Sequence, residues 1–232
     1  MAASARPLDG WVVAFDLDGT LVDTAPDLIG TLNVLLEAEG HEPFALEDAR
    51  PFIGRGAKWM IGRGFAAAGA PRTPTQIDVL FERFLTVYLG RIAQESRPFP
   101  GLESALDALA ADGARLSVCT NKLTHLSVAL MEALGLAHRF AGITGADAAP
   151  APKPDPRHLI AAAEQAGGVI ERTIMVGDAG TDAGAAKAAG APLILVSFGY
   201  TETPVTELGA DILIDHFDAL PAACRRLAAA RP

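Results

Sequence analysis

The sequence predicts an α/β fold in which a parallel β-sheet carries helices on both faces and an all-helical segment follows the first strand. Short apolar, β-branched runs recur along the chain, and from about Phe99 onward patterns typical of helices separate them. Between Thr24 and about Phe99 the strand signals disappear. Regular alternation of strand and helix indicates a parallel sheet. We therefore expect a core domain formed by residues 1–23 and 98–232, with a helical domain at 24–97.

The first strand is predicted at Trp11–Asp16, where "WVVAFD" is short, apolar and β-branched. Further strands are predicted at Arg115–Thr120, Thr173–Gly177, Ala191–Phe198 and Ala210–Asp215, with a weaker candidate at Phe140–Gly145. Helical patterns such as "LESALDALAADG" and "HLSVALMEALGL" lie between them. This order predicts that the strands run in parallel.

Capping signals mark the starts of two helices in the inserted segment. Thr24 can cap a helix, with Asp27 as its acidic partner and Pro26 in the first turn. Thr73 and Gln76 form a second capping box, with proline between them at the first helical position. The segment ends at "RPFPG", residues 97–101, whose prolines and glycine are typical of a boundary.

Composition and charge exclude several classes of protein. Half of the 232 residues are hydrophobic, yet no apolar run approaches the roughly 18 residues that span a bilayer. The first ten residues lack the apolar core of a signal peptide, so we expect a cytoplasmic protein. A net charge of −9 argues against nucleic-acid and membrane partners. A local cationic site could still bind an anionic substrate.

Polar residues follow several of the predicted strands, at the edge where an open parallel sheet binds ligands. These residues are Asp16, Asp18, Thr120, Asn121, Lys153, Asp178 and Asp182. Oxygen ligands without histidine or cysteine at ligand spacing suit Mg²⁺, which would neutralise the acids and hold a phosphate. Taken singly, each residue has a simpler interpretation as a turn residue, a helix cap or a solvated charge. Their joint occurrence favours a site.

Four stretches resemble the motifs of the haloacid dehalogenase superfamily, in its phosphoglycolate-phosphatase-like branch. They are "FDLDGTLVDT", "VCTNK", "KPDP" and "GDAGTD", in this order along the chain. The resemblance implies a Rossmann-like core and a mobile helical cap domain at 24–97. It also implies a Mg²⁺-dependent phosphomonoester hydrolase of carbohydrate metabolism, with phosphoglycolate as the first expected substrate. Such an enzyme acts on a small phosphorylated metabolite as a monomer or homodimer.

The resemblance also implies a role for each acid. Asp16 would be the nucleophile that becomes an aspartyl phosphate, and Asp18 the general acid and then the general base. Asp16, the backbone carbonyl of Asp18 and Asp178 would bind Mg²⁺. Asp182 would support the metal's water shell or Lys153.

Other residues would bind the phosphate. Thr120 and Lys153 would hold its oxygens, helped by the backbone of Asn121. Gly19 lets the loop turn tightly and bring N–H groups toward the phosphate. One position departs from the family pattern, because Ala179 stands where a serine or threonine is common.

In the predicted cap, "IGRGAKWM" at residues 53–60 is the most suggestive segment for substrate recognition. Arg55 or Lys58 could pair with a substrate carboxylate. The alternative is that both are solvated charges on the surface of the cap.

Other functions remain open at the level of sequence. The same site could serve a sugar phosphomutase of the β-phosphoglucomutase type, or a phosphatase for another sugar phosphate or for pyrophosphate. A non-catalytic module that is phosphorylated as a signal is disfavoured, because such a module needs neither Asp18 nor a large cap. Cleavage of carbon–halogen or carbon–phosphorus bonds is disfavoured, because dehalogenation needs no Mg²⁺ cluster and the phosphonatase branch is expected to lack an acid at position 18.

Overall fold

The structure, a computed structural model, describes residues 6–201 and 203–231. Residues 1–5 lie outside this part. They are half of the ten residues on which the prediction of no signal peptide rests. A six-stranded sheet forms the centre of the molecule, and each of its pairings is parallel. Its strands are β1 (Val12–Phe15), β4 (Arg115–Cys119), β5 (Gly142–Thr144), β6 (Thr173–Gly177), β7 (Leu193–Val196) and β8 (Ile212–Ile214). The predicted α/β class is thus confirmed, and the weakest candidate strand is real.

The strand order is β5-β4-β1-β6-β7-β8, which places β1 between β4 and β6. Val12 of β1 pairs with Arg115 of β4 on one side and with Thr173 of β6 on the other. The three strands therefore end at the same edge, and residues that follow them in sequence meet there.

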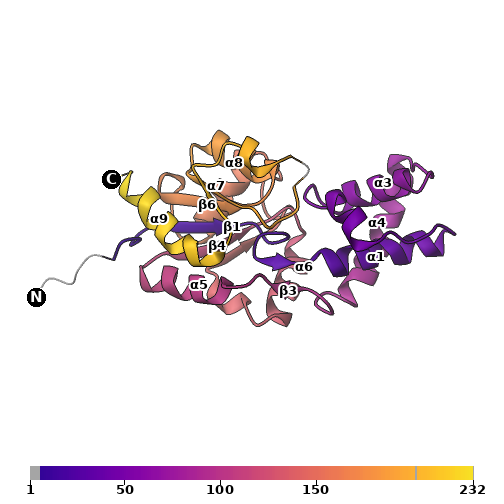
Figure 1. The fold of residues 1–232 in the computed structure, drawn as a ribbon, viewed down its shortest axis with the longest axis horizontal. Coiled ribbons are helices and arrows are strands. Elements are labelled where there is room, and N and C mark those ends of the chain that lie inside the picture. The colour runs from indigo at the N-terminus through magenta and orange to yellow at the C-terminus, as the bar shows by residue number, and fades with distance from the viewer. Residues whose placement is uncertain (1–5, 202, 232) are drawn as a thin grey trace, which may run out of the picture.

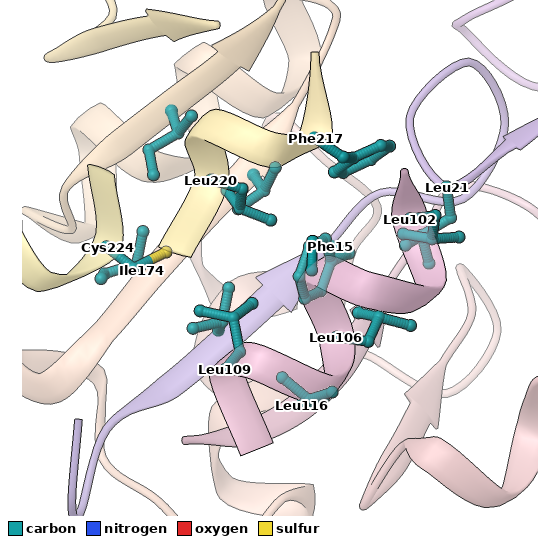
Figure 2. Close-up of a cluster of buried hydrophobic side chains, with 14 of the residues drawn as sticks. Phe15, Leu21, Leu102, Leu106, Leu109, Leu116, Ile174, Phe217, Leu220 and Cys224 are labelled. Atoms are coloured by element: carbon teal, nitrogen blue, oxygen red, sulfur yellow. The ribbon is translucent and has the colours of Figure 1, made fainter. Parts of the chain in front are cut away.

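Helices cover both faces of the sheet. On one face lie α5 (Leu102–Ala111) and α9 (Leu220–Ala229), and on the other α7 (Pro156–Gln165) and α8 (Gly180–Ala189). Successive side chains of a strand point to opposite faces. Phe15 accordingly packs against Leu102 and Leu106 of α5 (Figure 2), whereas Ala14 packs with the cluster beneath α7 and α8.

The core contains further helical segments besides these four helices. Helix α6 (Thr124–Ala133) follows β4. The short 3₁₀ helices there are η2 (Ala137–Arg139), η3 (Ile170–Arg172), η4 (Val205–Glu207) and η5 (Phe217–Ala219).

Helices also fill the predicted inserted segment. They are α1 (Ala25–Ala38), α2 (Leu46–Ala49), η1 (Arg50–Phe52), α3 (Ala57–Ala67) and α4 (Pro74–Leu89). They share a hydrophobic cluster of their own and lie together at one end of the molecule, toward which the arrow of β1 points (Figure 1). The chain leaves the core through β2 (Val22–Asp23) and returns through β3 (Arg97–Pro98), which pair antiparallel. That this segment moves as a separate domain remains a prediction.

The two predicted capping boxes have different outcomes. At α4, the Thr73 side chain accepts from the Gln76 backbone and the Gln76 side chain accepts from the Thr73 backbone, as predicted. At α1 the helix begins directly after Thr24, with Pro26 and Asp27 in its first turn as predicted, but the predicted cap is wrong because the Thr24 side chain makes no capping hydrogen bond. Thr24 has helical φ and ψ of −97° and −4° rather than the extended conformation usual for a cap. Asp27 instead accepts hydrogen bonds from Glu95 and Ser96 of the returning chain.

Within residues 6–201 and 203–231, no helix has both the length and the apolar character that crossing a membrane requires.

Candidate active site

Three buried carboxylates meet at the carboxyl edge of the sheet. Asp16 follows β1, whereas Asp178 and Asp182 follow β6. Each offers an oxygen that lies within 4.8 Å of the others. Asp16 is 7% exposed, Asp178 1% and Asp182 0%. Such crowding of acids away from water is costly unless cations lie among them.

Lys153 supplies one of these cations. Its Nζ lies 2.6 Å from Asp182 Oδ1 and 3.0 Å from Asp16 Oδ1, and its side chain is fully buried. Although burial disfavours the charged ammonium, the ion pairs with Asp16 and Asp182 raise the pKa of Lys153. Lys153 is therefore a fixed positive charge beside Asp16.

The loop that carries Lys153 is held by side chains from two other elements. Asn121 donates to the Lys153 carbonyl at 3.0 Å and accepts from the Lys153 N–H at 2.9 Å. His158 Nδ1 accepts from the same N–H at 3.1 Å. Burial lowers the pKa of His158 to about 4, so its ring is neutral and can accept. The side chain of Asn121 thus has a structural role that the sequence did not reveal.

Asp178 is positioned by the loops after β1 and β7. Thr20 donates to its Oδ1 at 2.8 Å and the Tyr200 N–H donates to its Oδ2 at 2.7 Å. Gly19, at φ +83°, passes so close that an added Cβ would lie 2.5 Å from Asp178 Oδ2. Only glycine fits this approach, which agrees with the tight turn predicted at Gly19. Thr20 and Tyr200 were not predicted; Thr20 lies inside the first motif, whereas Tyr200 has no signal in the sequence.

Both carboxylate oxygens of Asp182 are bound by other groups of the protein. Its Oδ2 accepts from the backbone N–H groups of Asp178 and Ala179, and its Oδ1 pairs with Lys153. It therefore supports Lys153 and the loop that carries Asp178. The small Ala179 side chain removes none of these contacts.

The charge balance of this cluster fits a divalent cation. Burial raises the pKa of Asp16 to about 7, and the charge of Asp182 acts in the same direction while Lys153 opposes it. Burial, with the charges of Asp182 and Asp16, also raises the pKa of Asp178 well above its usual range. The donors are carboxylate and backbone oxygens, which Mg²⁺ prefers. The described residues therefore fit Mg²⁺, for which Asp16 and Asp178 would supply carboxylate ligands.

Asp18 lies apart from the three acids and faces a second lysine. Lys122 Nζ donates to both oxygens of Asp18, at 2.9 and 3.1 Å. The same ammonium lies 4.5 Å from the centre of the Tyr88 ring in α4. Ion pairing with Asp18 raises the pKa of Lys122 despite its burial. Lys122 was not assigned a role from sequence, although it stands in the "VCTNK" motif only two residues after Thr120.

Thr120 lies between these groups. It is buried, its N–H donates to the Thr144 carbonyl of β5, and its Oγ1 accepts from the Lys122 N–H at 3.2 Å. Strand β4 therefore brings Thr120, Asn121 and Lys122 to the edge where Asp16 and Asp18 lie.

A cavity of about 390 Å³ extends from this edge toward the helical segment. Its lining includes Asp16, Asp18, Thr120, Arg55 and Lys58. The Arg55 guanidinium stacks on the Trp59 ring at 4.1 Å, and Lys58 forms an exposed ion pair with Asp78 at 2.6 Å. Both cap candidates thus line the cavity, but the Arg55 charge lies against the Trp59 ring and the Lys58 charge is paired with Asp78 in an exposed position.

This fold and site define a class of protein. Residues 13–196 match the family described as haloacid dehalogenase-like hydrolase. The chain belongs to the haloacid dehalogenase-like hydrolases.

Named relatives are similar along nearly the whole chain. A phosphoglycolate phosphatase of Caulobacter vibrioides is 53% identical over 230 residues, which cover 99% of this chain and 97% of that protein. One from Agrobacterium fabrum is 47% identical and covers 94% of this chain and 93% of its own length. Among solved structures, a predicted phosphoglycolate phosphatase from Haemophilus somnus has a TM-score of 0.84 at 28% identity, covering 91% of this chain and 96% of the other.

Proposed function

We propose that this chain is a Mg²⁺-dependent phosphomonoester hydrolase whose substrate is 2-phosphoglycolate. The observation that carries the reaction type is the buried cluster in which Asp16 faces Lys153 at 3.0 Å and shares an edge with Asp178. The substrate is supported by the relatives named phosphoglycolate phosphatase, which are 39–53% identical over most of the chain.

Asp16, the backbone carbonyl of Asp18 and Asp178 hold Mg²⁺ in this proposal. When bound there, the ion would neutralise the charge of the acids and of the phosphate, so that an anionic nucleophile could approach an anionic group. Asp182 supports this arrangement through Lys153 and through the backbone of the loop that carries Asp178.

Asp16 performs the first chemical step. Its carboxylate oxygen bonds to phosphorus, and the bond from phosphorus to the ester oxygen breaks. Lys153, the Thr120 hydroxyl and the backbone N–H groups near Asn121 and Gly19 bind the phosphoryl oxygens and stabilise their charge.

Asp18 moves the protons. It gives its proton to the departing alkoxide, which leaves as glycolate. It then takes a proton from a water molecule that attacks phosphorus, and the bond to Asp16 breaks to release phosphate. Asp16 and Asp18 thereby return to their initial states.

Residues 24–97 act as a cap domain over a core formed by 1–23 and 98–232. The position of α1, α3 and α4 beyond the end of β1 supports this division (Figure 1), as does their separate hydrophobic cluster. A closed cap excludes water from the first step and reopens to release products.

The partner is a small phosphorylated metabolite rather than a nucleic acid or a membrane. The net charge of −9 supports this choice, because a broadly acidic surface repels other polyanions. The proposal also places the enzyme in the cytoplasm as a monomer or homodimer.

Phosphate release from 2-phosphoglycolate tests the proposal. Purified protein should release phosphate with Mg²⁺ and stop when EDTA is added. Asp16→Asn should lower kcat by at least about 10³-fold, because the nucleophile is lost. Asp107→Asn, at an exposed ion pair with Arg139, is the matched control and should leave the rate unchanged. Full turnover by Asp16→Asn would refute the mechanism, and a requirement for a sugar bisphosphate would identify a phosphomutase.

A further inference from the structure

The cavity contains a second polar end, formed by Lys122 and Tyr88, that the chemistry proposed above does not use. We propose that these two side chains form the subsite for the substrate's second anionic group, the carboxylate of phosphoglycolate. This inference rests on the proposed function and assigns the residues that select its substrate.

Lys122 has the position and the charge that such a subsite needs. It is 9% exposed, and its ammonium faces the cavity beside Asp18. Its backbone N–H is bound to Thr120 Oγ1, so the side chain starts from the phosphate end of the cavity. Among the described residues, Asp18 is its only ion-pair partner. A substrate carboxylate that enters the cavity can replace the Asp18 carboxylate in this pair.

Tyr88 provides an independent sign of a ligand. Its side chain is fully buried, lines the cavity and lies against the Lys122 ammonium. Among the described residues, its hydroxyl donates to no acceptor, since the neighbouring Lys122 ammonium can itself only donate. A buried hydroxyl without an acceptor is costly, and an acceptor from a ligand would remove that cost. Because Tyr88 belongs to α4 and Lys122 follows β4, the subsite joins the helical segment to the core.

The rest of the cavity offers a carboxylate little else. Its lining beyond the sheet edge is largely apolar: Leu28, Ile53, Met60, Phe81, Phe84, Leu85, Leu123 and Leu126. Arg55 is exposed and stacked on Trp59, and the Lys58 side chain is 55% exposed in its pair with Asp78. A carboxylate that leaves water needs a buried cation. Of the described cationic residues that line the cavity, Lys122 is the one that is buried.

Two substrates that differ in one group separate this role from simple positioning of Asp18. In 2-hydroxyethyl phosphate a hydroxymethyl group replaces the carboxylate of 2-phosphoglycolate. If Lys122 binds the carboxylate, Lys122→Met should lower the ratio of the two kcat/KM values by about 10- to 100-fold, the size of a charged hydrogen bond. Tyr88→Phe should lower the same ratio by about 10-fold. If Lys122 only positioned Asp18, Lys122→Met would lower kcat/KM equally for both substrates and leave their ratio unchanged.

Binding of inert analogues provides a readout other than turnover. Calorimetry with 3-phosphonopropionate and with propylphosphonate, in Mg²⁺, compares ligands with and without the carboxylate. Wild-type protein should prefer 3-phosphonopropionate, and Lys122→Met should lose that preference while its thermal unfolding confirms a folded protein. Arg55→Met and Lys58→Met are the matched controls and should keep it.

The outcomes distinguish the inference from the function beneath it. An unchanged ratio in Lys122→Met, with an unchanged binding preference, would overturn the subsite and leave the phosphatase intact. Loss of preference in Arg55→Met or Lys58→Met instead would move the subsite to the rim. Wild-type protein that hydrolyses 2-hydroxyethyl phosphate as well as 2-phosphoglycolate would contradict the proposed substrate itself.

Discussion

At the scale of single residues, Asp16 shows how the site trades stability for chemistry. In the proposed mechanism Asp16 is the nucleophile and must be ionised, yet burial raises the pKa of Asp16 to about 7 from 3.8. The folded protein therefore binds a proton more readily than the unfolded chain, and the stability due to this group falls as pH rises from about 4 to about 7. In the absence of metal, ionised Asp16 destabilises the native state.

A variant that mimics protonated Asp16 tests this linkage. In EDTA at pH 8, Asp16→Asn should be more stable than the wild type by roughly 1 to 4 kcal/mol, because one to three units of pKa difference correspond to that range. The advantage should shrink toward pH 5, where wild-type Asp16 is protonated in the native state. Urea unfolding at both pH values measures it.

The wild type must be compared with Asp16→Asn, because His158 changes the stability of both proteins with pH in the direction opposite to Asp16. Its pKa is lowered to about 4, so its contribution to stability is lost as pH falls below 6.5. Both proteins contain His158, and the difference between them isolates Asp16. Saturating Mg²⁺ should cancel or reverse the advantage of Asp16→Asn. An advantage that is the same at pH 5 and pH 8 would contradict this account.

The same scale shows what the sequence could and could not predict about the site. Asp16, Asp178, Asp182 and Lys153 were predicted to converge, because each follows a strand end of one parallel sheet. Lys122 also follows such an end, but nothing in its local sequence says which carboxylate it faces. Its pairing with Asp18 depends on side-chain direction across 104 residues of chain separation, which motif spacing does not encode.

At the scale of elements, Asp27 fixes helix α1 to the chain that returns to the core. Its buried carboxylate accepts from the Ser96 N–H at 2.8 Å, from the Ser96 hydroxyl at 2.7 Å and from the Glu95 N–H at 3.0 Å. Arg91 lies 3.8 Å away. These contacts bridge 68 and 69 residues of sequence and fasten the first and last parts of the helical segment together.

Removing this carboxylate should be far more harmful than removing an exposed one. Asp27→Ala leaves two N–H groups and a hydroxyl unpaired and should lower the free energy of unfolding by about 3 kcal/mol or more. Asp78→Ala, the control, breaks an exposed pair with Lys58 and should cost less than about 1 kcal/mol. Urea denaturation of both variants measures the contrast. Equal losses would mean that Asp27 does not hold the element in place.

The capping predictions succeed or fail for the same physical reason. At Thr73 the box is exposed, so only neighbouring residues compete for its hydrogen bonds, and the local pattern is sufficient. At Thr24 the helix starts inside the protein, and the returning segment takes the Asp27 carboxylate. Tertiary contacts thus override the local signal where the element is buried.

At the scale of the whole molecule, the sheet and its covering helices follow from the regular alternation of apolar runs and helical patterns. The placement of the helical segment does not. No role at the site was predicted for Tyr88, because its contact with Lys122 depends on how α4 folds back over the sheet edge. The cavity between the two parts is a product of this arrangement, and so is any motion that opens it.

A reversible covalent link would show whether that motion is needed for turnover. Gly54, in the helical segment, lies close to Ala179 at the sheet edge: an added Cβ at Gly54 would be 4.0 Å from the Ala179 Cβ. This separation suits a disulfide. The native Cys119 and Cys224 are buried and unpaired with each other, so they should not interfere.

The double variant Gly54→Cys/Ala179→Cys should be trapped in the observed arrangement when oxidised. If the cap must open to admit 2-phosphoglycolate and release products, oxidation should lower kcat by at least about 10-fold, and dithiothreitol should restore it.

Cysteine at position 54 is strained, because Gly54 has φ +112°. That strain is present in both redox states and in the Gly54→Cys single variant, whose rate should not respond to dithiothreitol. Thiol titration confirms the bond. A fully oxidised double variant that turns over as fast as its reduced form would show that the helical segment is a fixed wall rather than a moving cap.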